Sequence, residues 1–172
     1  MNEAFSDLSV NGDIETNNDP LEFTKKIMNE SKSGYVYSSV WGNNTVSSEV
    51  ECLTGIPTLF TTKGARIFQL YMNKNMPSLA RVFDDYGYDT YGIHPYDGDG
   101  YHRRSSWETL GFENQLFIED FVNPRLIRGY VSDKSNYEKI IEIDEKNEKP
   151  IFIFNVTMQN HGGYLENLEL KD

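Results

Sequence analysis

The sequence predicts a layered α/β fold, in which one sheet carries helices on both of its faces. Segments with strand composition alternate with segments that repeat apolar residues at helical spacing, which is typical of this class. The run 150–156 is almost continuously apolar. Such a run favours a strand that is covered on both faces, as in a parallel sheet. The length of 172 residues fits a single domain.

Four segments have the pattern of helices. Asp19 and Ser132 can each cap a helix, because their side-chain oxygens can accept hydrogen bonds from the free N–H groups of a first turn. Gly55 and Gly87 follow two of the segments where a C-terminal cap belongs. The predicted helices cover 19–28, 45–53, 77–87 and 132–146.

Strands are predicted at 35–41, where aromatic and β-branched residues are concentrated, at 90–93 and at 150–156. The second strand leads into the polar segment 94–104, which holds two histidines, two arginines, two aspartates and two tyrosines. We expect this segment to be a binding loop, because loops at strand ends carry function disproportionately. In a parallel sheet such loops gather at the carboxyl edge, so the polar clusters should meet there.

Composition and charge exclude several classes of function. Lys and Arg number 16 and Asp and Glu number 27, so the net charge of −11 disfavours nucleic acid as a partner. Hydrophobic residues at 38% exclude a disordered acidic chain. No apolar run is long enough for a transmembrane helix, and from the acidic start 1–7 we expect no export signal. The single cysteine, Cys52, is expected to be a buried thiol of a helix.

Thr45 follows a Gly-Asn-Asn turn and opens a predicted helix. The free N–H groups and the helix dipole at such a position favour an anion such as phosphate. The hydroxyl could act as a nucleophile if a bound divalent metal stabilised its alkoxide. The alternative is that Thr45 only caps the helix, which is the more frequent role of threonine there.

Polar residues of the loop and of the chain ends are the other candidates. His94, Asp97, Tyr101 and Arg103 could grip a phosphodiester or a polyol, the arginine through paired hydrogen bonds. Stabilisation of the loop itself explains them equally well. His161 follows the last predicted strand and is a plausible ligand contact.

Four ordered motifs carry a family resemblance. They are Asn-Glu-Ala-Phe-Ser-Asp at 2–7, Gly-Asn-Asn-Thr-Val-Ser-Ser-Glu at 42–49, His-Pro-Tyr-Asp leading to Tyr-His-Arg within 94–103, and Thr-Met-Gln-Asn-His at 157–161. Together they resemble the lipoteichoic acid synthase branch of the alkaline phosphatase and sulfatase superfamily. The resemblance implies a sulfatase-like fold and transfer of phosphoglycerol or a similar head group.

The resemblance also implies roles for single residues. Glu3 and Thr45 would be ligands of a divalent metal, manganese or magnesium, and Thr45 would also be the nucleophile. His94, Arg103 and His161 would bind the phosphate and glycerol of the substrate. Tyr101 stands where the lipoteichoic acid enzymes carry a tryptophan.

For the parent protein, the resemblance implies a phosphatidylglycerol-like lipid as donor, a polymer as acceptor, and a membrane anchor at the outer face of the bacterial cell membrane. We expect 1–172 to be a single, partial catalytic domain of impaired or no activity. It would lack the first strand, the downstream Asp-His metal motif and the membrane helices. The alternatives are a non-catalytic remnant that binds glycerol phosphate or glycan, and hydrolysis by a sulfatase or phosphodiesterase.

Overall fold

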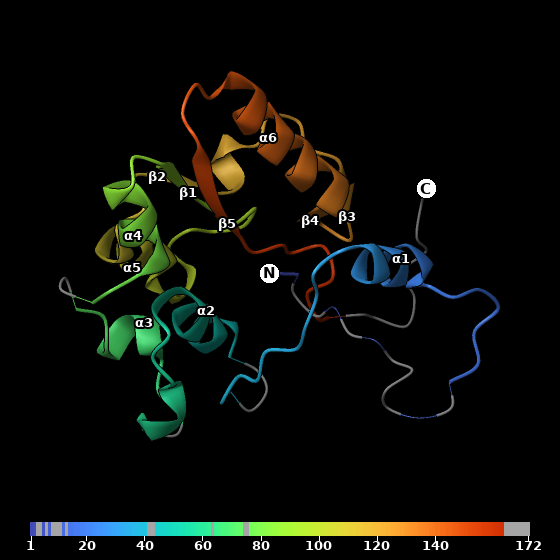
Figure 1. Cartoon of the computed structure of the whole chain (residues 1–172), viewed down its shortest axis with the longest axis horizontal. Helices are drawn as coiled ribbons and strands as arrows, with labels where there is room; N and C mark the ends of the chain where they lie inside the picture. Colours follow the sequence, from blue (N-terminus) through green and yellow to red (C-terminus); the bar gives the residue numbers. More distant parts are fainter. Residues whose placement is uncertain are drawn as a thin grey trace.

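The structure, a computed structural model, describes residues 1–163 except 3–4, 6, 8–11, 13, 41–43, 63 and 74–75. Its main helices are α1 (Glu22–Glu30), α2 (Thr45–Thr54), α3 (Ile67–Leu70), α4 (Leu79–Asp85), α5 (Arg103–Leu110) and α6 (Asp133–Lys146). Its strands are β1 (Asp89–Ile93), β2 (Asn114–Leu116), β3 (Leu126–Ile127), β4 (Tyr130–Val131) and β5 (Ile151–Asn155). Figure 1 shows their arrangement.

Three parallel strands form the central sheet, in the order β2-β1-β5. Tyr91 of β1 lies opposite Asn114 on one side and Ile153 on the other. Helix α5 connects β1 to β2 and helix α6 precedes β5, so both crossovers are helical, as parallel pairing requires. The strands predicted at 90–93 and 150–156 are therefore confirmed, together with the α/β class.

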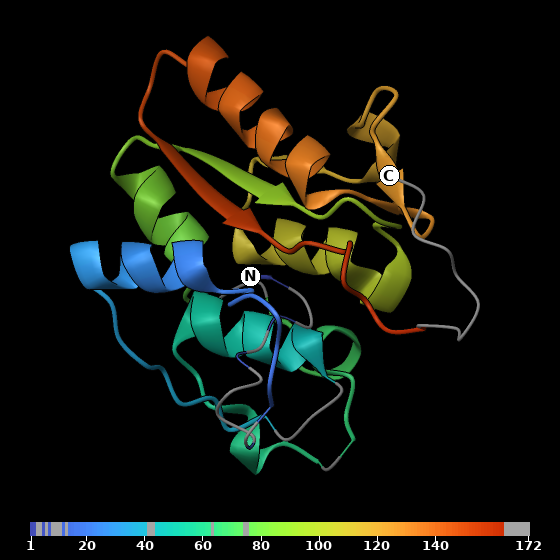
Figure 2. The same ribbon diagram turned by 90° about the vertical axis from the view of Figure 1, so that its right-hand side faces the viewer.

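Helices cover both faces of this sheet (Figure 2). On β5, Phe154 points into the larger core cluster, with Phe152 packed against it, beside residues of α2, α3, α4 and α5. The intervening Ile153 packs into a second cluster with Ile140 and Ile143 of α6. This alternation follows from the period of two along a strand, and the layered arrangement with helices on both faces is confirmed.

Gly92 of β1 allows α5 to lie directly on the sheet. A Cβ atom at this position would come within 2.5 Å of the Trp107 ring, and Trp107 is fully buried. The predicted loop 94–104 is shorter than expected, because α5 already begins at Arg103. The loop therefore ends at His102, and Arg103 belongs to the buried face of a helix instead.

The predicted helices differ in how closely they match the helices of the structure. Helix α2 ends as expected, with Gly55 in the left-handed conformation at φ 69°, and α6 begins with the Ser132 side chain accepting from the Ser135 N–H. Helix α4 begins two residues later than predicted, after the cap residue Ser78. Helix α1 forms, but none of its residues is buried.

Two expectations are wrong. The segment 35–40 is not a strand: residues 35–37 are almost fully exposed, and the segment is fixed instead where Ser38 and Ser39 donate hydrogen bonds to the Glu51 carboxylate. Strand-favouring side chains do not form a strand without a neighbour that pairs with them. Cys52 is exposed on α2 and not buried.

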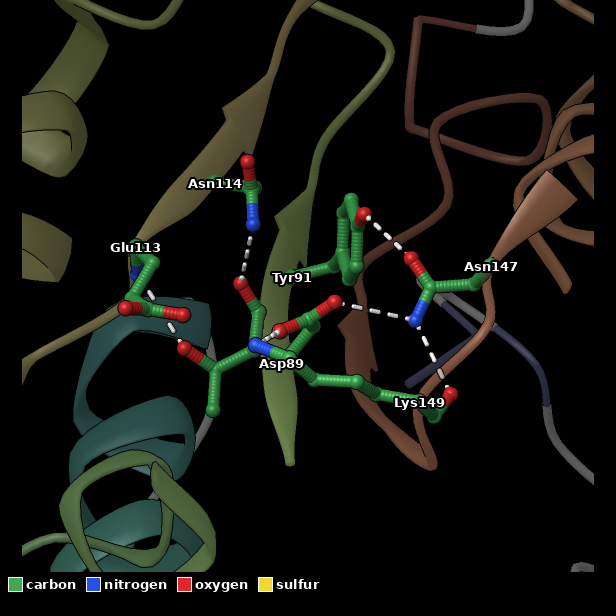
Figure 3. A network of polar contacts seen from close by, with 7 residues as sticks. Asp89, Tyr91, Glu113, Asn114, Asn147 and Lys149 are labelled. Carbon is green, nitrogen blue, oxygen red and sulfur yellow. Dashed lines mark hydrogen bonds and ion pairs between the residues drawn. The ribbon is translucent and has the colours of Figure 1, made fainter. Parts of the chain in front are cut away.

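The amino-terminal edge of the sheet is closed by a network of polar contacts (Figure 3). Asn147 donates to Asp89 at 3.0 Å and accepts from the Tyr91 hydroxyl at 3.1 Å. Lys149 forms an ion pair with Asp89 at 2.8 Å. These contacts fix the connection between α6 and β5 to the start of β1.

In the part of the chain that the structure describes, no helix has both the length and the apolar character needed to cross a bilayer.

Candidate active site

A cavity of about 440 Å³ opens at the carboxyl edge of the sheet, opposite the network of Figure 3. Its wall includes six residues that the sequence analysis singled out: Thr45, His94, Asp97, Tyr101, Arg103 and His161. The fold thus brings together side chains that are more than a hundred residues apart in the chain. The seventh candidate, Glu3, lies outside the described residues.

Thr45 is the first residue of α2, and Asn44 is the cap residue. The Asn44 carbonyl accepts the first helical hydrogen bonds, from the N–H groups of Ser47 at 3.0 Å and Ser48 at 3.4 Å. The interpretation of Thr45 as the capping residue is therefore wrong. Its side chain is half-buried and lines the cavity, at the helix end that favours an anion.

Arg103 is held by a buried ion pair with Glu49. Its Nη2 donates to the Glu49 Oε1 at 2.6 Å and its Nε donates to Oε2 at 3.2 Å. The Glu49 side chain is fully buried and that of Arg103 is 5% exposed. The two-point geometry fixes the guanidinium plane, and Nη1 lies on the side away from Glu49. Further N–H donors of Arg103 can therefore serve the cavity whose wall it forms.

Sequence reasoning missed the role of Glu49, although a signal for it exists. Val46, Val50 and Leu53 form the buried face of α2, and Glu49 falls on the same face. A carboxylate among apolar residues at helical spacing needs a buried partner. Because Glu49 follows Thr45 by one helical turn, its ion pair also joins the starts of α2 and α5.

His94 follows β1 and is buried. Its Nδ1 lies 2.9 Å from the carbonyl oxygen of Val156, and since a carbonyl only accepts, Nδ1 carries the proton. Burial lowers the pKa of His94 to about 3, with a further contribution from the positive charge of Arg103. His94 is therefore neutral, and its unprotonated Nε2 can accept a hydrogen bond from a hydroxyl in the cavity.

Tyr101 and His102 adopt left-handed backbone conformations, at φ 55° and 62°. Such conformations are costly for residues other than glycine and are concentrated at functional sites. They turn the chain into α5, so that Arg103 points inward while Arg104 pairs with Glu119 at 2.6 Å on the surface. Tyr101 lines the cavity with its side chain half exposed.

Asp97 lies in a tight turn of the same loop. Its Oδ1 accepts a hydrogen bond from the Asp99 N–H at 2.9 Å. The next residue, Gly98, has no room for a Cβ atom, which would lie 2.7 Å from the Phe117 ring. The turn is therefore fixed by packing, and it leaves Asp97 exposed at the cavity.

The loop of His161 is held by the β3–β4 hairpin, another feature that sequence reasoning missed. Arg128 donates to the carbonyl oxygens of Gln159 at 3.4 Å and His161 at 3.0 Å. The Tyr130 hydroxyl lies 3.5 Å from the His161 Nδ1. Arg128 and Gly129, both with positive φ, form the two-residue turn that suits such a hairpin.

The described residues do not by themselves form a complete metal site. No group of three or more His, Cys, Asp or Glu side chains with suitable geometry occurs among them. Thr45 is the one described member of the predicted ligand pair. The chain start lies at the same sheet edge, because the Asn2 side chain accepts from the Thr157 hydroxyl at 3.1 Å just after β5.

A hydroxyl at a helix N-terminus, an arginine fixed by a carboxylate and a neutral histidine share one cavity at the carboxyl edge of a parallel sheet. This arrangement suits a phosphate-type ester. The family model described as Sulfatase matches residues 2–170. The chain belongs to the sulfatase family.

One relative and three solved structures are similar to this chain. The chain is 32% identical over 174 residues to a putative cyclic beta-1,2-glucan modification protein of Rhizobium meliloti (strain 1021). The alignment covers all of this chain and 26% of that protein. The phosphoglycerol transferase GacH of Streptococcus pyogenes, solved with sn-glycerol-1-phosphate, has a TM-score of 0.81 at 24% identity, over 94% of this chain and 43% of that one.

Two further structures share the fold. The lipoteichoic acid synthase LtaP of Listeria monocytogenes has a TM-score of 0.62 at 23% identity, over 73% of this chain and 31% of that one. A Vibrio parahaemolyticus protein of the alkaline phosphatase superfamily has a TM-score of 0.63 at 24% identity, over 79% and 34%. The predicted sulfatase and alkaline-phosphatase-like fold is confirmed. The chain spans about a quarter of the relative's length and less than half of each solved chain.

Proposed function

We propose that this chain is part of a metal-dependent enzyme that transfers phosphoglycerol, or a similar phosphate-linked head group, from a lipid to a cell-envelope polymer. The observation that supports this most is the shared cavity of Thr45 and the Glu49-bound Arg103. The similarity to a phosphoglycerol transferase and to a glucan modification protein suggests the class of donor and acceptor.

In the proposed reaction, the Thr45 hydroxyl oxygen attacks the phosphorus of a phosphatidylglycerol-like lipid. An oxygen–phosphorus bond forms to Thr45, the bond from phosphorus to the diacylglycerol oxygen breaks, and the hydroxyl proton ends on the diacylglycerol. A hydroxyl of the acceptor then attacks the same phosphorus. Thr45 leaves with a proton, and the phosphoglycerol is attached to the acceptor.

The chain's own residues would stabilise and orient these species. Charge that develops on the phosphoryl oxygens would face the N-terminus of α2 and the guanidinium of Arg103, which Glu49 holds in place before the reaction. The neutral His94 would accept a hydrogen bond from a hydroxyl of the glycerol. His161, Tyr101 and Asp97 line the mouth of the cavity and would contact the outer part of the substrate.

The divalent cation, manganese or magnesium, is part of the proposal. Glu3 and Thr45 would hold it, since both offer oxygen ligands of the kind these ions prefer. When bound, such an ion lowers the pKa of a coordinated hydroxyl. We also propose a membrane-anchored parent protein at the outer face of the cell membrane.

Hydrolysis is the second candidate, because the matching family model is that of sulfatases. In this case water replaces the acceptor hydroxyl in the second step. Release of free glycerol phosphate in the presence of an acceptor polymer would favour hydrolysis, whereas attachment to the polymer would favour transfer.

The test is a mass measurement on the full-length protein after exposure to phosphatidylglycerol and manganese. The wild type should gain the mass of phosphoglycerol on the peptide that contains Thr45. Thr45→Ala should show no adduct, and Thr45→Ser, which keeps a hydroxyl, should retain a reduced amount. Turnover that persists in Thr45→Ala contradicts the proposal. Metal-independent binding of glycerol phosphate without any adduct would favour the non-catalytic remnant.

A further inference from the structure

Four aromatic side chains lie at the cavity: Tyr96, Tyr101 and His161 line it, and Tyr130 packs between Tyr96 and His161. The Tyr96 ring centroid lies 5.9 Å from that of Tyr130, which lies 5.7 Å from the ring of His161. Tyr96 and Tyr101 both line the cavity and are 45% and 54% exposed. We call Tyr96, Tyr101 and Tyr130 the tyrosine rim. Because two of its rings remain half exposed, burial in the core does not account for them.

The backbone that carries Tyr96 and Tyr130 is fixed before any ligand binds. The Tyr96 N–H donates to the His94 carbonyl at 2.7 Å, and the Tyr96 carbonyl accepts from the Ile118 N–H at 3.2 Å. Tyr130 belongs to strand β4, paired with Ile127. Rigid aromatic side chains bind a ligand at a low cost in conformational entropy.

The polar groups beside the rim favour a ligand with hydroxyl groups. Asp97 contributes a carboxylate, which only accepts hydrogen bonds, and the neutral His94 contributes an accepting Nε2. A carboxylate repels phosphate, so Asp97 does not suit the phosphoryl group that Arg103 suits. Aromatic rings beside hydroxyl acceptors match a sugar, whose C–H faces can stack while its hydroxyls donate.

Charge decides between a neutral and an anionic polymer. The chain carries a net charge of −11, and Asp97 and Asp99 lie in the loop of the rim. The two arginines that follow in the same segment are both paired, Arg103 with Glu49 and Arg104 with Glu119 at 2.6 Å and with Asp99 at 3.5 Å. Arg66 lies 6.0 Å from the Tyr101 ring, so the charge around the rim is mixed, but the net charge of the chain still disfavours a polyanion relative to an uncharged glycan at low salt.

We infer that the tyrosine rim and Asp97 form a subsite for the sugar rings of a neutral glycan, which serves as the acceptor. The inference rests on the proposed transfer reaction and names the class of its acceptor. The glycan would lie on the rim, with one hydroxyl reaching toward the part of the cavity where Thr45 and Arg103 lie.

The experiment is a set of titrations of the full-length protein with three probes: a neutral β-1,2-linked gluco-oligosaccharide, an oligomer of glycerol phosphate and sn-glycerol-1-phosphate. The gluco-oligosaccharide should bind more tightly than the oligomer at low salt. In the wild type, saturation of tyrosine ring protons should transfer to sugar C–H protons in the NMR spectrum, a readout that needs no variant.

Substitutions then locate the glycan. Tyr96→Ala should weaken gluco-oligosaccharide binding by about tenfold, the loss expected for one stacking ring. Tyr130→Ala, which removes the ring that packs against Tyr96 and His161, should weaken this binding as well. The loss for sn-glycerol-1-phosphate should be much smaller. Tyr130→Phe keeps the ring and should retain most of the affinity, and Tyr86→Ala, an exposed tyrosine that follows α4, should change nothing.

The outcomes separate the two proposals. Binding of sn-glycerol-1-phosphate without binding of the gluco-oligosaccharide overturns the glycan inference and leaves the transfer proposal intact. The glycan inference is also overturned if Tyr96→Ala and Tyr130→Ala bind the gluco-oligosaccharide as tightly as the wild type does. Tighter binding of the glycerol phosphate oligomer than of the gluco-oligosaccharide overturns it too. Absence of binding by sn-glycerol-1-phosphate as well would count against the proposed function itself.

Discussion

The two edges of the parallel sheet carry similar polar residues and use them differently. At the amino-terminal edge, Lys149 and Asn147 bind Asp89 and hold the pKa of that carboxyl below its usual range. At the carboxyl edge, His94, Asp97 and Arg103 line a cavity. Polar groups that satisfy one another stabilise a connection, whereas groups with donor or acceptor capacity turned toward a cavity can bind a ligand.

The carboxyl edge also carries the unusual backbone. Tyr101 and His102 are in the left-handed region, at φ 55° and 62°, whereas Asp89 and Tyr91 belong to a regular strand. Strain of this kind persists only when the surrounding structure enforces it. Here the enforcing element is α5, held between Gly92 and the Glu49 ion pair.

The largest expected effect comes from breaking the buried ion pair. Glu49→Gln leaves the Arg103 charge buried without its counter-charge, and should lower the free energy of unfolding by about 3–5 kcal/mol. Urea denaturation measures this loss. The double variant Glu49→Leu/Arg103→Met should lose less than the sum of its single variants. Additive losses would show that the two side chains are not coupled.

The next effect is a dependence of stability on pH that comes from His94. The folded state keeps His94 neutral down to its lowered pKa of about 3, while in the unfolded chain it takes up a proton below about pH 6.5. The contribution of neutral His94 to the free energy of unfolding is complete above about pH 6.5. It is lost progressively as the pH falls toward 3, and amounts to a few kcal/mol in total, on the order expected for such a shift.

Urea denaturation between pH 7.5 and 4.5 tests this on the wild type and His94→Gln. The free energy of unfolding should fall more steeply with decreasing pH in the wild type than in His94→Gln. Parallel curves for the two proteins would mean that His94 is not held neutral by the fold.

A smaller loss is expected where α5 rests on β1. Gly92→Ala puts a methyl group within 2.5 Å of Trp107, and overpacking of this kind costs about 1–3 kcal/mol. Because Trp107 and Arg103 share α5, the affinity for glycerol phosphate should fall together with the melting temperature. Unchanged affinity would show that the start of α5 does not depend on the packing of its middle.

The smallest effect is expected at the amino-terminal edge. Lys149→Ala removes an exposed ion pair, and such pairs contribute little. Calorimetry should show a melting temperature shift smaller than that of Gly92→Ala, and titration an unchanged affinity for glycerol phosphate. A loss of affinity would contradict the separation of the two edges.

Much of this arrangement could be predicted from the sequence, because the determining signals are local. The apolar run 150–156 indicated a buried strand, and the Gly-Asn-Asn-Thr turn indicated a helix that begins near Thr45. The parallel direction of the strands then placed their polar ends at one edge. The contacts that assemble the cavity wall could not be predicted, because they join residues far apart in the sequence.

The predictions that failed did so for the same reason, because contacts between residues far apart in the sequence decided the structure. The Arg103 side chain is buried at the start of α5 because Glu49 balances its charge, and nothing near Arg103 in the sequence shows this. Composition predicted a strand at 35–41, but in the described part of the segment Ser38 and Ser39 bind the Glu51 carboxylate and no strand forms. Hydrogen bonds from Ser39, Thr58 and Ser38 outweigh the burial that would raise the Glu51 pKa, and lower it to about 2.

The most direct test of whether the cavity of Thr45 and Arg103 binds phosphate is a crystal structure of the full-length protein with sn-glycerol-1-phosphate and manganese. The phosphate should lie in the cavity, within hydrogen-bonding distance of the Arg103 guanidinium and beside the Thr45 hydroxyl. A ligand bound elsewhere, or a phosphate that Arg103 does not contact, would contradict this prediction.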